Sequence, residues 1–287
     1  MSAVQEAGDA EPVQVLVSLH DQMNLMDVAG PLEVMSKTLH NPADKESQAF
    51  DITVCAAEPR VMTNAGIPLG AQITFDEAHK RLKEFDVLIV PGGNILKIIK
   101  EEEEPLDLIK AYCELQKNDP TRERSLLGVD TAALLFAKQG ILQGLAATTH
   151  PDWYIKMEHM CQEAASNDTQ ERTDVMEERY VVNHGRFEIG EDEEENPYVF
   201  KKARRTSSAR KGSVLRRMSN TRRESIIKRA NMKLGGLRVI TTGGPASGLD
   251  ATLYLVSALV SHDSANEAAR LMQYDWVKGV VVDAIDV

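Results

Sequence analysis

The sequence has few cysteine and aromatic residues and no long apolar run. Its three cysteines, Cys55, Cys113 and Cys161, lie far apart in 287 residues. An odd number at such spacing favours neither a disulfide framework nor a paired-cysteine metal site. No apolar stretch approaches the ~20 residues that cross a bilayer. We therefore expect a soluble protein of a reducing compartment, the cytoplasm.

Several motifs that mark known chemistry are also missing. The chain has no Gly-x-Ser-x-Gly, no His-Glu-x-x-His and no phosphate-binding loop. Gly243, Gly244 and Gly248 follow an expected strand, but their Gly-Gly-Pro start departs from the dinucleotide fingerprint. The formal net charge of −11 argues against nucleic acid as a partner of the folded body. The sequence thus predicts neither a cofactor nor a metal.

Hydrophobic residues make up 43% of the chain, enough for a core, and they follow alternating strand and helix patterns. After a flexible N-terminus, residues 1–12, this alternation predicts one domain over residues 13–287. The expected fold is α/β, with a doubly wound, mostly parallel sheet and helices on both faces. We expect strands at 13–19, 50–56, 85–90, 125–129, 146–150, 179–183 and 237–241, an irregular strand or hairpin at 61–75, and helices at 30–39, 105–116, 131–140, 152–165 and 264–273. A long helix that the segment 242–250 starts is expected to run to about residue 261.

The central feature of the pattern is the segment from Ser125 to Gly140. A short apolar run ending at Val129 predicts a buried strand, and helical spacing begins at Thr131. Only Asp130 separates the two elements. A strand that enters a helix through one residue is the layout of a nucleophile elbow, which presents a side chain beside the N–H groups of a helix start.

Two further segments place polar groups after expected strands. Asp27 lies in an Asp-x-x-Gly-Pro-x-x-Val pattern, with Gly30-Pro31 opening a helix. A structural interpretation of Asp27 is that it caps this helix. Gly92 and Gly93 follow the strand that precedes the elbow strand, although Pro-Gly-Gly alone is common in α/β folds.

These segments resemble the ThiJ/PfpI superfamily, whose fold is that of the class I glutamine amidotransferases, and most of all its isocyanide (isonitrile) hydratase branch. The resemblance rests on Gly128-Val-Asp-Thr-Ala-Ala-Leu-Leu, on Gly140 to His150 and on the Asp27 pattern. It covers Val13 to about Asn183 and Leu237 to about Tyr274. It implies a flavodoxin-like fold, a homodimer and an acidic Asp27 beside the elbow. That branch carries a nucleophilic cysteine where this chain has Asp130, so thiolate chemistry cannot be transferred.

Two carboxyl groups close together in a cleft cannot both ionise cheaply, so one pKa should rise. We therefore expect Asp130 and Asp27, assisted by Thr131, to perform acid–base chemistry as a hydratase, lyase or isomerase on a small electrophilic carbonyl or isonitrile-like compound. Gly92, Gly93 and His150 are candidate oxyanion or ligand-binding residues, and His150 is alternatively structural. The other interpretation is an inactive homologue, a ligand-sensing or dimeric interaction protein in which Asp130 only caps a helix.

The chain also contains a charged insertion, residues 185–235. An acidic block, Glu191 to Glu195, precedes a basic one from Lys201 to Lys233. Segregated charge of this kind predicts disorder. Ser219 and Ser225 follow arginine pairs and resemble sites of a basophilic kinase, and the basic block allows nuclear import as an alternative localisation. The simpler interpretation is a solvated loop.

Overall fold

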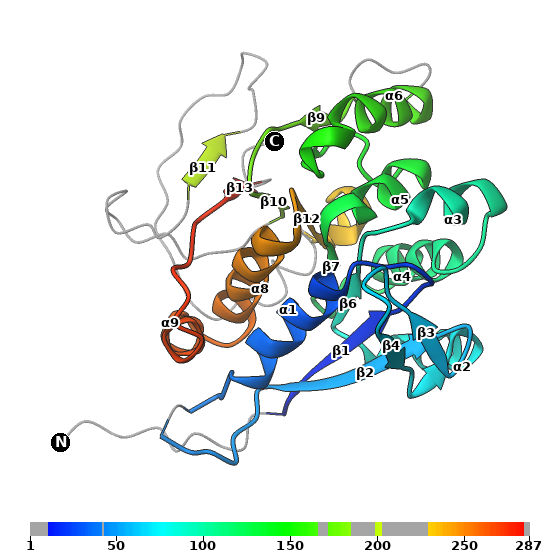
Figure 1. The fold of residues 1–287 in the computed structure, drawn as a ribbon. Helices are drawn as coiled ribbons and strands as arrows, with labels where there is room; N and C mark the ends of the chain where they lie inside the picture. Colours follow the sequence, from blue (N-terminus) through cyan, green and yellow to red (C-terminus); the bar gives the residue numbers. More distant parts are fainter. Residues whose placement is uncertain (1–10, 42, 166–171, 185–198, 203–228, 284–287) are drawn as a thin grey trace.

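The computed structural model describes residues 11–283 except 42, 166–171, 185–198 and 203–228, which are drawn in grey in Figure 1. At its centre lies a sheet with the strand order β11-β13-β10-β12-β7-β6-β1-β2-β5. The strands are β1 (Val13–Ser18), β2 (Phe50–Ala56), β5 (Ile73–Thr74), β6 (Val87–Val90), β7 (Ser125–Gly128), β10 (Tyr180–Asn183), β11 (Val199–Lys202), β12 (Arg238–Thr242) and β13 (Val280–Asp283).

The middle of this sheet is parallel and fully buried. β1 pairs with β2 and β6, β6 pairs with β7, and β7 pairs with β12, all in parallel. The side chains of β6 and β7 are buried along their whole length. Continuous apolar strands of this kind are expected where helices cover both faces of a parallel sheet.

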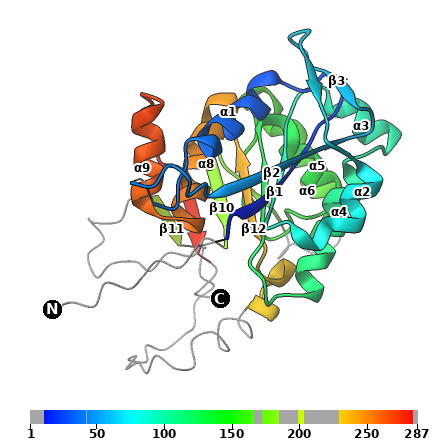
Figure 2. The same cartoon turned by 90° about the horizontal axis from the view of Figure 1, so that it is seen from below.

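Helices form a layer on each face of the sheet. Val15 and Val17 of β1 pack in one hydrophobic core, on one face of the sheet. Leu16 points to the opposite face and packs in a second core. Figure 2 shows α1, α8 and α9 on one side of the sheet and α2 and α4 on the other. The first layer contains α1 (Leu25–Ser36), α8 (Pro245–Leu259) and α9 (His262–Leu271), and the second contains α2 (Phe75–Arg81), α3 (Ile95–Glu101), α4 (Leu106–Asn118), α5 (Ala133–Lys138) and α6 (Tyr154–Ala164).

The predicted α/β fold with a mostly parallel sheet is confirmed, but several elements differ from the prediction. The first helix begins at Leu25, so Pro31 lies inside it and not in its first turn. The expected strand 146–150 is reduced to β8 (Ala146–Ala147), which pairs with β9 (Asp174–Val175) outside the main sheet. The segment 61–75 does form a hairpin, β3 (Arg60–Met62) with β4 (Pro68–Gly70), and Thr74 caps α2.

The structure describes two short parts of the segment 185–235 that was predicted to be disordered, residues 199–202 and 229–235. Val199–Lys202 form β11, which pairs in parallel with β13 at the edge of the sheet, on the side of β13 opposite β10. Leu234 is buried, and the Arg229 guanidinium lies 2.9 Å from Glu123. The acidic block and the kinase sites Ser219 and Ser225 lie outside the described residues.

The strand directions place the ends of the charged segment at one edge of the sheet. β10 is antiparallel to β12, and Asn183 faces Val239 near the start of β12. β11 runs parallel to β13 and β10, so Lys202 ends at that same edge. Arg229 also lies there, since it contacts Glu123 just before β7. Lys202 and Arg229, the described residues that flank 203–228, therefore both lie at the amino edge of β7 and β12.

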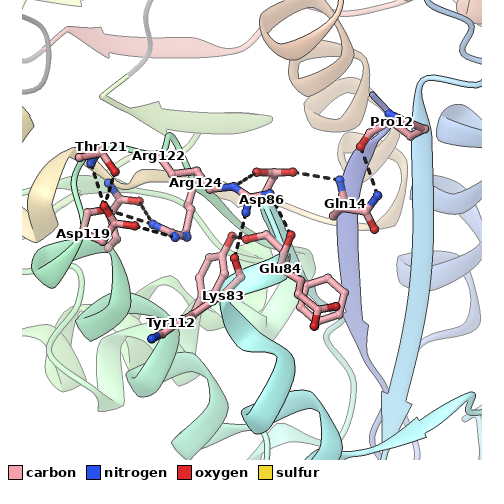
Figure 3. A network of polar contacts seen from close by, with 12 residues as sticks. Pro12, Gln14, Lys83, Glu84, Asp86, Tyr112, Asp119, Thr121, Arg122 and Arg124 are labelled. Carbon is pink, nitrogen blue, oxygen red and sulfur yellow. Dashed lines mark hydrogen bonds and ion pairs between the residues drawn. The ribbon is translucent and has the colours of Figure 1, made fainter. Parts of the chain in front are cut away.

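A polar network fixes the amino edge of the sheet (Figure 3). Asp86 accepts a 3.0 Å hydrogen bond from the Gln14 N–H of β1 and a 2.5 Å bond from Arg122 Nε. The Arg122 guanidinium also donates to the carbonyl oxygens of Lys83 and Glu84. The network ties together the segments that enter β1, β6 and β7. Among the described helices, none is long and apolar enough to cross a membrane.

Candidate functional site

The predicted site residues come together at the carboxyl ends of β1, β6, β7 and β12. In an open parallel sheet, this edge is where ligands bind. The loop after β1 leads to Asp27, the loop after β6 contains Gly92 and Gly93, and β7 leads to Asp130. A cavity of about 440 Å³ near Gln14, Asp86 and Arg122 lies at the opposite edge of the sheet. Neither Asp27 nor Asp130 lines it.

The backbone at Asp130 has the strained shape that an elbow requires. Its φ is +60°, a conformation that non-glycine residues rarely adopt. Val129 before it is extended, and a 3₁₀ turn, Asp130–Ala132, leads into α5. Two threonines hold this turn, one at the end of β12 and one in the segment after β8: the Asp130 N–H donates to Thr242 Oγ1 (3.1 Å), and Thr149 Oγ1 donates to the Asp130 carbonyl (3.2 Å).

The glycine loop lies against the elbow with no room for side chains. A Cβ on Gly92 would lie 2.7 Å from Thr131 Oγ1, and one on Gly93 would lie 2.5 Å from the Gln22 carbonyl oxygen. The Gly93 N–H donates to Thr131 Oγ1 (2.9 Å), and the Gly92 N–H donates to Asp27 Oδ2 (3.0 Å). Both N–H groups have acceptors within the protein, so the oxyanion role expected of these two glycines stays a prediction that requires these bonds to be exchanged for bonds to a ligand.

Asp27 is fully buried in the first turn of α1. Its Oδ2 accepts two hydrogen bonds, from the Gly92 N–H and from Asn24 Nδ2, each 3.0 Å long. Its Oδ1 is buried and has no hydrogen-bond partner among the described residues. Burial, and secondly the negative charge of Asp130, raise the pKa of Asp27 to about 7, against the two donated hydrogen bonds.

Asp130 is almost fully buried as well, and burial raises its pKa. The opposing effects come from the Thr131 N–H, which donates to Asp130 Oδ1 (2.6 Å), and from the charge of His150. The Asp130 carboxylate thus has groups that stabilise its anion, whereas Asp27 has a free oxygen and a like charge nearby. Near neutral pH the arrangement favours a proton on Asp27 and a charge on Asp130.

His150 is partly exposed and has a structural contact. Its Nδ1 accepts from the Asp152 N–H (3.3 Å) and caps the turn Pro151–Trp153. When the ring is protonated instead, its positive charge lowers the pKa of Asp130 and Nδ1 no longer accepts. On the other side of the site, burial lowers the pKa of His20, whose Nε2 lies 3.1 Å from the Pro91 carbonyl oxygen.

Asp27 lies inside the first turn of α1 and does not cap it, whereas Asp130 Oδ1 accepts the Thr131 N–H at the start of the elbow turn, so a structural role for Asp130 stays open. The residue that precedes the elbow turn is Val129, and the residue that precedes α1 is Asn24; neither makes a side-chain capping bond. The sequence analysis missed Asn24, His20, Thr149 and Thr242, since no motif marks them. Asn24 lies three residues before Asp27, a spacing that brings side chains together at the start of a helix.

No group of three or more His, Cys, Asp or Glu side chains in the described part of the chain is arranged to hold a metal ion. The titratable groups that meet at the elbow are the two aspartates and His150. What this arrangement can do is move a proton between a neutral carboxylic acid and a carboxylate.

The chain belongs to the DJ-1/PfpI family, whose family model matches residues 13–186. It is 27% identical over 138 residues to isonitrile hydratase of Pseudomonas putida, a match that covers 48% of this chain and 52% of that protein. The chain thus spans about half the length of that relative. A protein of Streptomyces lividans encoded in the cpoL 5′ region is 26% identical over 141 residues, 49% of this chain and 89% of its own.

Solved structures show the same fold at low sequence identity. A ThiJ/PfpI family protein from Pseudomonas syringae superposes with a TM-score of 0.56 and 16% identity, covering 96% of this chain and 82% of its own. Drosophila melanogaster DJ-1beta gives a TM-score of 0.53 and 13% identity, covering 93% and 100%. The flavodoxin-like fold implied by the family resemblance is confirmed.

Proposed function

We propose that the protein is a cofactor-independent acid–base enzyme of the hydratase, lyase or isomerase type. The observation that carries this proposal is the buried carboxyl group of Asp27, whose Oδ1 has no protein partner, beside the carboxylate of Asp130. A neutral acid close enough to an ionised one to be affected by its charge supplies the two components that general acid–base catalysis needs.

The hydrogen bonds of Asp27 specify which oxygen holds the proton. Oδ2 accepts two N–H groups, so a proton there would face two donors. The proton of the neutral acid therefore resides on Oδ1, from which it is donated to the substrate. Asp130 accepts a proton from water or from the substrate. The N–H groups of Gly92 and Gly93 are engaged within the protein. The negative charge that develops on the substrate is therefore neutralised by the proton from Asp27 Oδ1, not by an oxyanion hole.

The substrate class we propose is a small electrophilic carbonyl or isonitrile-like compound. Addition of water to such a compound requires one proton to be removed from water and one to be delivered to the substrate, which matches the Asp130 and Asp27 pair. The similarity to isonitrile hydratase over half of that protein supports the isonitrile as the first compound to test.

The test measures hydration of a small aliphatic isocyanide and of a small α-dicarbonyl compound by purified protein. Asp130→Asn and Asp27→Asn are each expected to lower kcat by about 10²–10⁴-fold, the usual contribution of a general acid or base. Asp51→Asn, an exposed site on β2, is the matched control and should keep the full rate. Absence of turnover by the wild type, or equal rates in all variants, would overturn the proposal.

A second candidate is a ligand-sensing or dimeric interaction protein without catalysis. The observation in its favour is that Asp130 Oδ1 accepts from its own Thr131 N–H, a contact that supports the turn without any chemistry. In this case Asp130→Asn should leave ligand affinity within a few-fold. Enzymatic use of Asp130 predicts a large loss of rate in the same variant.

The assembly and the regulation are further parts of the proposal. We propose a cytoplasmic homodimer that uses the first helix, where Met26 is 43% exposed. Light scattering should give twice the chain mass of 31.7 kDa, and a monomeric mass would contradict it.

We also propose Ser219 and Ser225 as substrates of a basophilic kinase. Phosphate incorporation into the wild type should be lost in the Ser→Ala variants, and equal incorporation would contradict the proposal.

A further inference from the structure

The hairpin β3–β4 contacts the loop that leads from β1 to Asp27. The Gln22 N–H donates to the Met62 carbonyl (2.7 Å), and the Asn64 N–H donates to the Met23 carbonyl (2.9 Å). Met23 also forms a bridge with Thr63 on one side and with Gly93 on the other. This loop is therefore held between the hairpin and the glycine loop.

A chain of side-chain hydrogen bonds continues from the hairpin to the buried acid. Asn64 Nδ2 donates to Asn24 Oδ1 (2.7 Å), and Asn24 Nδ2 donates to Asp27 Oδ2 (3.0 Å). A carboxamide has one acceptor end and one donor end. Since Asn64 takes the acceptor end of Asn24, the donor end of Asn24 has to face Asp27.

We propose that Asn64 is a positioning residue for Asp27: it fixes the amide of Asn24, which confines the acidic proton of Asp27 to Oδ1. The proposal rests on the proposed function, in which Asp27 donates that proton. If the Asn24 amide were reversed, its oxygen would face Asp27 Oδ2, and the proton would move to Oδ2 to satisfy it. Oδ1, the oxygen without a protein partner, would then have no proton to give.

The charged and titratable groups around Asp27 do not depend on Asn64. Asp130 acts on Asp27 from the elbow, and His150 acts on Asp130 from the segment after β8. His20, at the end of β1, is buried and held by the carbonyl oxygens of Asp21 and Pro91. Asn64 is exposed and carries no charge. A change in Asp27 on removal of Asn64 therefore has to pass through Asn24.

The experiment follows the ionisation of Asp27 by NMR of ¹³Cγ-labelled aspartate in the full chain, with Asp27→Asn to assign the signal. The variants are Asn64→Ala, Asn24→Ala and the double variant. Because the Asn24 bond stabilises the Asp27 anion, its loss raises the pKa. We expect a rise of about 0.5 in Asn64→Ala, about 1 in Asn24→Ala, and no further rise in the double variant.

Asn118→Ala, an exposed asparagine at the end of α4, is the matched control and should leave the titration unchanged. The proposal is overturned if Asn64→Ala leaves the Asp27 titration unchanged, or if the two single shifts add in the double variant. Failure of the proposed function gives a different result, in which no isocyanide or dicarbonyl is hydrated while the coupled shifts persist. Where turnover is found, the rate of Asn64→Ala should fall off at a higher pH than that of the wild type, by the same increment.

Discussion

The Gly93 N–H donates a 2.9 Å hydrogen bond to Thr131 Oγ1, and through this bond the glycine loop and the elbow keep a fixed spacing. Both ends of the bond belong to loops that follow neighbouring strands, β6 and β7. In the glycine loop, Gly92, which precedes Gly93, donates its N–H to Asp27. The position of Asp130 relative to Asp27 therefore depends on Thr131.

Thr131→Val should lower the free energy of unfolding by about 1–2 kcal/mol, because the Gly93 N–H loses its acceptor in a part-buried position. Urea denaturation measures the change. Thr53→Val, at a half-buried position of β2, is the matched control and should change stability by less than about 0.5 kcal/mol. Equal effects of the two substitutions would show that the bond contributes nothing.

The ionisation of Asp27 should make the protein less stable as the pH rises. Its pKa is about 7 in the folded chain against 3.8 for an exposed aspartate, so the folded state binds the proton more tightly. The stability is then fully present below about pH 4 and is lost up to about pH 7, by about 4 kcal/mol over that window. Denaturation curves of wild type and Asp27→Asn across this window test it. Parallel pH profiles of the two proteins would refute the raised pKa.

The backbone at Asp130 predicts an unusual order of stability. Glycine adopts a φ of +60° freely, whereas alanine is strained there by about 1–2 kcal/mol. Asp130→Gly should therefore be more stable than Asp130→Ala by about 1 kcal/mol, although both lose the carboxylate and its bond to Thr131. Thermal unfolding compares them directly. A more stable alanine variant would be incompatible with a left-handed elbow.

Gly92→Ala should disrupt the site, because the added Cβ would lie 2.8 Å from the Thr131 main-chain nitrogen and 2.9 Å from the Val129 carbonyl oxygen. Main-chain atoms cannot move aside cheaply, so we expect a loss of about 1–3 kcal/mol and of the Asp27 contact. Gly70→Ala is the control, because a Cβ there would lie 4.0 Å from its nearest neighbour, the Pro59 carbonyl oxygen. Calorimetry of the two variants measures the difference, and similar melting temperatures would contradict the close approach.

The elbow could be predicted because a strand pattern and a helix pattern meet at a single residue, Asp130. The start of α1 could not, because Pro31 suggested a first turn where the chain already has a helix from Leu25. The engagement of the Gly92 N–H and the contact of Asn64 with Asn24 depend on hydrogen bonds between segments far apart in the sequence. Local pattern carries no information on such bonds. The strands β11 and β13 were missed for the same reason, since their pairing joins residues about eighty positions apart.

Lys202 and Arg229, which flank residues 203–228, lie at the amino edge of the sheet, whereas the two aspartates lie at the carboxyl edge. Arg229 lies before the start of β7, and Asp130 follows its end, so the four residues of the strand, about 13 Å, stand between them. Residues inserted between Lys202 and Arg229 would begin and end at the edge of the sheet opposite the loops that contain the two aspartates. Such a position tolerates growth during evolution, and in the laboratory it offers a place to graft a reporter while the chemistry at the other edge is left intact.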